Sequence, residues 1–104
     1  MAVRVTEDNF NSEVIEANGI VIVDFYSDSC VPCKRIAPVL AEIEEENEDV
    51  KLVKVNINFD RSLAEKYDVQ ASPTLIFFKN GVESNRTRGA VKKAEISEII
   101  NNIR

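Results

Sequence analysis

The chain contains two cysteines, Cys30 and Cys33, separated only by Val31 and Pro32. They follow the apolar segment "IVIVDFY" and precede a segment with apolar residues at helical spacing, so they fall where a strand gives way to a helix. A thiol at a helix N-terminus meets the positive end of the helix dipole and free backbone N–H groups, and both favour the thiolate. The spacing and position of the cysteines therefore predict a reversible dithiol–disulfide couple.

The two thiols are expected to act in sequence. Cys30 comes first and should be the more exposed, so it is the candidate for attack on a substrate disulfide. Cys33 lies about one helical turn further on and can attack the mixed disulfide to displace the product. Pro32 suits the first helical turn, because a missing N–H costs nothing there.

Two other uses of the cysteine pair are less consistent with the composition. Zinc normally takes four nitrogen or sulfur ligands, and a chain with two cysteines and no histidine could supply four only by sharing thiolates across a dimer. A structural disulfide closing so short a loop would restrict the unfolded chain by roughly 2 kcal/mol, and a reducing compartment would keep opening it. We therefore expect thiol chemistry and no metal.

Asp24 stands within the otherwise apolar segment 20–26, where a carboxylate is expensive to bury. Two interpretations are open: a hydrated carboxylate at a strand end, or a buried carboxyl with a raised pKa that exchanges protons with Cys33. The chain has no histidine, so few other groups could serve. Lys54, in the segment "LVKVN", could pair with Asp24 or simply point outward from its strand.

The length and composition bound the remaining possibilities. At 104 residues and 44% apolar composition, the chain is expected to form one domain, residues 1–104. Its net charge of −5 disfavours phosphate backbones and anionic lipids, so neither nucleic acid nor a membrane is expected as a partner. Residues 1–10 lack the apolar core of a signal peptide. We expect a cytoplasmic monomer.

Strand-like and helix-like patterns alternate along the chain. The expected elements are strands at 3–5, 20–26 and 50–57, helices within 6–17, 33–48, 61–69 and 96–103, and a hairpin over 74–89 with Asn80-Gly81 at its turn. The order β-α-β-α-β-α-β-β-α indicates a mixed sheet between helices. The segment 20–26 is almost continuously apolar, which is typical of a strand buried on both faces.

Several stretches, in matching order, resemble the thioredoxin family: "VDFYSDSCVPCKRIAP", "VKVNIN", "YDVQASPTLIFFKNG" and "RGA". The resemblance covers nearly the whole chain. It implies an α/β thioredoxin fold with a central five-stranded mixed β-sheet flanked by four α-helices. It also implies a thiol-disulfide oxidoreductase without a bound cofactor, which reduces disulfide-containing protein substrates and is recharged by a thioredoxin reductase. Asp24 and Lys54 match the family's buried acid and its lysine partner.

The resemblance also assigns substrate-binding residues outside the cysteine pair. It implies a cis peptide bond between Ser72 and Pro73, in a loop that lies beside the cysteines. Backbone groups of this loop, including Thr74, would bind an extended substrate segment as in strand addition. Gly89 matches a glycine of the substrate groove, and Gly81 matches a turn glycine.

Two departures from the family pattern concern the neighbours of Cys30. Ser29 stands where most members have tryptophan, and Val31 stands where they usually have glycine. Ser29 could cap the helix but removes a flat apolar contact for the substrate. The stiffer Val31 could narrow the approach to Cys30. Together with Pro32, these residues are the candidate substrate contacts around the cysteines.

The main hypothesis is a carrier that reduces protein disulfides, with Cys30 attacking, Cys33 resolving and Asp24 assisting proton transfer. A second hypothesis is a binding module that grips a partner through its apolar rim, with incidental cysteines. A third is an oxidase or isomerase, which would need an oxidising compartment. The intact cysteine pair and Asp24 favour the first.

Overall fold

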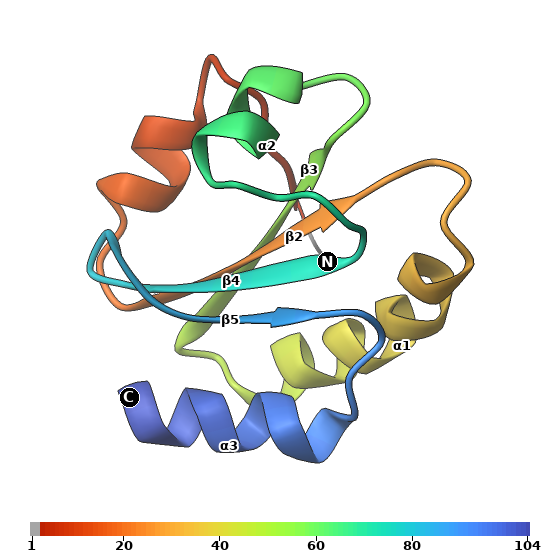
Figure 1. Ribbon diagram of the computed structural model, residues 1–104. Coiled ribbons are helices and arrows are strands. Elements are labelled where there is room, and N and C mark those ends of the chain that lie inside the picture. The colour runs from red at the N-terminus through yellow and green to blue at the C-terminus, as the bar shows by residue number, and fades with distance from the viewer. Residues whose placement is uncertain (1–2) are drawn as a thin grey trace.

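The computed structural model describes residues 3–104 (Figure 1). The elements in chain order are β1 (Val3–Arg4), η1 (Asn11–Ile15), β2 (Ile20–Tyr26), α1 (Val31–Glu46), β3 (Val50–Asn56), α2 (Arg61–Lys66), β4 (Thr74–Lys79), β5 (Val82–Arg88) and α3 (Lys93–Ile103). The predicted order of strands and helices is therefore confirmed. Strand β2 has the bounds that its apolar run indicated.

The first helix is shorter than the predicted one and is a π-helix. Thr6 and Asp8 are of residue types that suit a helix cap, but neither caps this helix, because its first residue follows Phe10 directly. The Thr6 hydroxyl instead accepts from the Asp8 N–H at 3.3 Å, and the Thr6 N–H donates to Asn9 Oδ1 at 2.8 Å. These local hydrogen bonds hold the residues in a turn, so the helix begins after them.

The strands form one mixed sheet in the order β1-β3-β2-β4-β5. The central strand β2 pairs in parallel with β3 and antiparallel with β4. At one edge of the sheet, β1 is two residues long. At the other edge, β5 is exposed at most of its positions. The sheet therefore has a buried centre and short or polar margins.

Helices cover both faces of the sheet: α1 and α3 lie on one face, and η1 and α2 lie on the other (Figure 1). Alternate side chains of β2 enter two different cores because successive residues of a strand point to opposite faces. Ile20 and Ile22 pack with α1 and α3, whereas Val21, Val23 and Phe25 pack on the opposite face. By the same alternation, Asp24 lies on the face that α1 covers. Burial on both faces explains the continuous apolar run of this strand.

The β4–β5 hairpin turns at Asn80 and Gly81, which have φ values of 51° and 81°, as the Asn-Gly pair predicted. Asn80 also fixes the hairpin to the start of β2. Its Oδ1 accepts from the Gly19 N–H at 2.7 Å, and its N–H donates to the Gly19 carbonyl at 2.9 Å. A Cβ at Gly81 would collide with the Ile15 carbonyl oxygen at the end of η1. Only glycine suits this position, for reasons of both conformation and space.

Replacing Gly81 with alanine is expected to lower the free energy of unfolding by more than about 1–3 kcal/mol, the usual cost of a left-handed non-glycine residue. Gly19 is the matched control, because it has the same φ of 81° but its Cβ would lie 3.9 Å from the nearest atom. Gly19→Ala should therefore show the conformational cost without the collision. Urea denaturation of both variants measures the difference, and equal losses would contradict the packing argument.

Candidate active site

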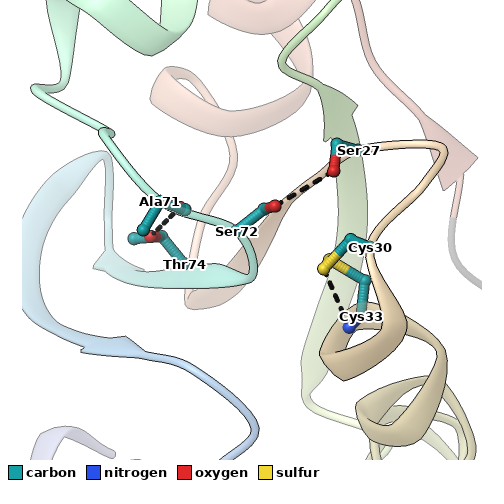
Figure 2. The surroundings of a disulfide bond; sticks show 6 residues. All are labelled: Ser27, Cys30, Cys33, Ala71, Ser72 and Thr74. Atoms are coloured by element: carbon teal, nitrogen blue, oxygen red, sulfur yellow. Dashed lines mark hydrogen bonds between the residues drawn. A yellow bond between two sulfur atoms is a disulfide. The ribbon is translucent and has the colours of Figure 1, made fainter.

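The two cysteines lie at the start of α1, directly after the loop that follows β2 (Figure 2). Cys30 is the N-cap residue of α1 and has an extended backbone, with φ −91° and ψ 110°. The two sulfurs form a disulfide, with 5.2 Å between the Cα atoms. The Cys33 N–H donates to Cys30 Sγ at 3.0 Å. The sulfur of Cys30 therefore already accepts a hydrogen bond from the first helical turn, which is where a thiolate is stabilised.

Two expectations about the cysteine loop are wrong. Cys30 is not the more exposed thiol, since both cysteines are 8% exposed. The Cys30 N–H donates to the Ser27 carbonyl at 3.4 Å, which holds the preceding loop in a turn. Ser29 does not cap α1, because Cys30 occupies the N-cap position and its sulfur accepts the capping hydrogen bond. Ser29 is left exposed beside the disulfide, and Val31 is 58% exposed on its other side.

A cavity of about 250 Å³ lies behind Cys33. Its lining residues are Asp24, Tyr26, Ser27, Asp28, Cys33, Lys34, Ala37 and Lys54. These residues come from the ends of β2 and β3, the loop after β2, and the first turns of α1. The topology thus brings the predicted acid, its lysine and the second cysteine around one space.

Asp24 is a buried carboxyl, as the second of the two interpretations predicted. Its Oδ1 has no hydrogen-bond partner among residues 3–104. Burial raises its pKa from 3.8 to about 6, and the positive charge of Lys54 opposes the rise without cancelling it. Lys54 is the direct neighbour of Asp24 across the parallel β2–β3 pair. Its Nζ lies 5.6 Å from the centroid of the Tyr26 ring, which keeps the ammonium near the cavity.

The loop before β4 lies beside the disulfide, and its Ser72–Pro73 peptide bond is cis, as the family resemblance implied. The Ser72 and Ser27 hydroxyls are 3.0 Å apart and hydrogen-bond the loop to the cysteine loop (Figure 2). The Thr74 hydroxyl donates to the Ala71 carbonyl at 2.7 Å and holds the loop in its turn. Thr74 therefore shapes the loop with its side chain.

Gly89 directly follows β5 and is hydrogen-bonded to the same loop. Its N–H donates to the Pro73 carbonyl at 2.8 Å, and its φ is 82°. A Cβ at Gly89 would meet nothing within 4 Å. The surface beside the loop is therefore open at this position, so a chain could approach it closely.

Sequence reasoning did not identify Ser27 as part of the site. Ser27 and Ser72 are 45 residues apart, and a serine in a polar loop carries no signal of a distant partner.

Neither a metal site nor a membrane span is present in the part of the chain that the structure describes. Residues 3–104 contain no group of three or more His, Cys, Asp and Glu side chains arranged to hold a metal ion. Among the same residues, no helix is long and apolar enough to span a membrane.

Comparison with known proteins gives the same family throughout. The family model described as Thioredoxin matches residues 1–102. A protein named Thioredoxin from Chlamydia caviae is 42% identical over 97 residues, which cover 93% of each chain. Another, from Rickettsia bellii, is 36% identical over 103 residues, or 98% of each chain. Thioredoxin 1 of Synechococcus elongatus is 39% identical over 101 residues, which cover 96% of this chain and 94% of the relative.

Proposed function

The chain belongs to the thioredoxin family, and from this premise we propose how its residues share the work of reducing protein disulfides. It is a thiol-disulfide oxidoreductase with a redox-active Cys30-Val31-Pro32-Cys33 sequence. The observation that carries the proposal is the Cys30–Cys33 disulfide at the first turn of α1, with Cys30 Sγ already accepting an N–H bond.

The reduced protein acts in two exchanges. The Cys30 thiolate attacks one sulfur of a substrate disulfide, forming a mixed disulfide and releasing the first substrate sulfur as a thiolate. Cys33 loses its proton and attacks the Cys30 sulfur, which breaks the mixed disulfide and releases the second substrate sulfur. The substrate gains two electrons, and the protein is left with the Cys30–Cys33 disulfide. The two cysteines are equally exposed, so exposure cannot decide which of them attacks first. We assign the first attack to Cys30 because it is the N-cap residue of α1.

Asp24 takes the proton of Cys33 during the second exchange, directly or through water. The carboxyl and Cys33 line one cavity, and a pKa of about 6 leaves the carboxyl mostly ionised at neutral pH and able to accept a proton. Lys54 moderates that pKa through its charge. In this role Lys54 is a positioning and electrostatic residue.

The substrate lies as an extended segment against the Ser72–Pro73 loop and Thr74, with Gly89 at its side. The bond between Ser72 and Ser27 supports this arrangement because it holds the loop beside the disulfide. The open space over Gly89 leaves room for a polypeptide backbone. Ser29, Val31 and Pro32 form the opposite border of the contact, and exposed Val31 supplies an apolar surface in place of the usual tryptophan.

A reductase must return two electrons to the protein after each cycle, since the steps above consume them. Disulfide-containing proteins as substrates and a reductase as donor are general properties of the family. For this chain we propose a thioredoxin reductase as the donor, a cytoplasmic location, and a monomer whose residues 1–104 form one domain.

Replacing Cys33 with serine is expected to arrest the cycle after the first exchange. A serine hydroxyl cannot displace the substrate, so the mixed disulfide on Cys30 should accumulate. Mass spectrometry of the variant mixed with a disulfide peptide would show one protein–peptide adduct, which a reductant removes. The matched variant Cys30→Ser should give no such adduct at Cys33. An adduct of equal yield on both variants would contradict the proposed roles.

A further inference from the structure

A second cavity, of about 320 Å³, adjoins the cavity behind Cys33. It is lined by Arg4, Tyr26, Asp28, Asn56, Asn58 and Phe59. Tyr26 and Asp28 also line the first cavity, so the two form neighbouring parts of one surface. This side of the disulfide is the one away from the Ser72–Pro73 loop, since β3 and β4 flank β2 on opposite sides.

The turn after β3 displays Phe59 to solvent, where it is 73% exposed. Asn56, itself 6% exposed, fixes this turn. Its Oδ1 accepts from the N–H groups of Asn58 and Phe59 at 2.9 and 3.3 Å. Its Nδ2 donates to Asp28 Oδ1 at 3.1 Å. A buried side chain thus holds both the exposed aromatic ring and the nearest carboxylate in place, which is a preorganised arrangement.

The Arg4 guanidinium lies over the exposed ring, with its Cζ 4.8 Å from the centroid of Phe59. With residues 3–104, its side chain forms no ion pair and no hydrogen bond. Because none of the described residues accepts a hydrogen bond from it, the guanidinium keeps its N–H donors free for a ligand. Those donors match the two oxygens of a carboxylate, which arginine can bind with two parallel hydrogen bonds.

The charge around the two cavities differs from that of the rest of the chain. The chain has 18 acidic and 13 basic residues. The cavities are lined by three cations, Arg4, Lys34 and Lys54, and by two carboxyl groups. Asp28 keeps its negative charge, since its partner Asn56 is neutral, and Asp24 is buried. The lining therefore holds one more cation than carboxyl groups, in a chain whose net charge is −5, and it favours an anionic partner more than the chain as a whole does.

We propose that the pocket formed by Arg4 and Phe59 binds an acidic side chain of the polypeptide whose disulfide the protein reduces. The carboxylate pairs with the Arg4 guanidinium, and the methylene groups of the same Asp or Glu residue pack on the Phe59 ring. The inference rests on the proposed reduction of protein disulfides and adds a substrate preference to it. The pocket acts in substrate recognition and takes no part in the exchange of electrons.

The test uses pairs of disulfide peptides that differ only in Glu or Gln, with this residue scanned through the positions flanking the reacting cysteine. The ratio of kcat/KM for the Glu peptide to that for the Gln peptide is measured at low and high salt. At the best position the wild-type ratio should reach about 3 to 5 at low salt and fall at high salt, because an ion pair at the surface is weak and is screened. Arg4→Met and Phe59→Ala should each bring the ratio below about 2.

Arg35→Met is the matched control, because Arg35 is an exposed arginine two residues after Cys33 that lines neither cavity. It should leave the Glu to Gln ratio as in the wild type. An equal loss of the ratio in this variant would assign the preference to general charge and overturn the proposed pocket, and so would a wild-type ratio near 1 at every position. In both cases the Gln peptides would still be reduced and the proposed function would stand. Wild-type protein that reduces neither peptide would overturn both.

Discussion

Replacing Cys30 with serine is expected to abolish the reduction of insulin disulfides, leaving only the rate of the added reductant. The hydroxyl of serine is not ionised at neutral pH and does not attack sulfur. The thiol it replaces belongs to the N-cap residue of α1, and its sulfur already accepts a hydrogen bond from the Cys33 N–H. Cys33 lies within the first helical turn and its N–H donates to Cys30 Sγ, so only Cys30 has the sulfur at the N-cap, and we expect Cys33 not to take over the first attack. The rate is measured by the turbidity of the released insulin chains.

A direct measure of Cys30 reactivity completes this prediction. In the reduced protein, Cys30 should react with iodoacetamide faster than free cysteine at neutral pH, because the helix N-terminus favours the thiolate. Urea denaturation of the Cys30→Ser variant serves as the control for folding, compared with the reduced wild-type protein. Turnover by Cys30→Ser at more than the background rate would mean that another group makes the first attack.

Replacing Asp24 with asparagine is expected to slow insulin reduction about 10- to 100-fold near pH 7, at or below the lower end of what a general base typically contributes. The loss should arise in the second exchange, when Cys33 must lose its proton. It should shrink above about pH 9, because a thiol with an ordinary pKa ionises there without help. The pH profile of the wild-type rate should show a step near pH 6, the pKa of the buried carboxyl, and the variant should lack it.

The same substitution is expected to stabilise the oxidised protein. Burial raises the pKa of Asp24 from 3.8 to about 6, so the folded state holds the proton more tightly than the unfolded state. The contribution of this carboxyl to stability is therefore complete below about pH 4 and is lost as the pH rises through about 6. One pKa unit corresponds to about 1.4 kcal/mol, so at pH 8 the uncharged asparagine side chain avoids a cost of up to about 3 kcal/mol. Urea denaturation at pH 4 and pH 8 should show the gain only at the higher pH.

Asp68→Asn is the control for both effects of the Asp24 substitution. Asp68 is exposed, lies outside both cavities, and has a φ of 53°, which asparagine also adopts readily. This variant should keep the step near pH 6 and show no comparable gain at pH 8. If Asp24→Asn reduced insulin at the wild-type rate across the pH range, the carboxyl would have no part in proton transfer.

The parts of the fold that follow from local patterns were predictable from the sequence. The run from Ile20 to Tyr26 defines β2 because a short apolar segment rich in Ile and Val is typical of a strand buried on both faces. The Asn80-Gly81 turn follows from the positive φ that both positions need. The first helix was not predictable in detail, because the side chains of Thr6 and Asn9 bind nearby backbone and redirect the start of the segment.

The site was predictable where a residue type, in its sequence context, has few possible roles. A carboxylate in an apolar strand indicated a buried acid, and two cysteines in an otherwise cysteine-free chain indicated a couple. The Arg4–Phe59 pocket carried no such signal, since its two residues lie far apart in the chain and neither type indicates the other as a partner. The capping role of Ser29 was mispredicted for one reason. A sulfur atom can cap a helix, and the pattern of polar residues gives no warning of it.

The margins of the sheet have a consequence for how the protein behaves at high concentration. Within residues 3–104, strand β1 has only two residues, and β5 carries Glu83, Arg86 and Arg88 along a largely exposed row. A long, flat, apolar row of unpaired peptide groups is what allows one chain to recruit another into a growing fibril. Neither margin provides that template, so the folded protein should resist amyloid-like aggregation even when crowded.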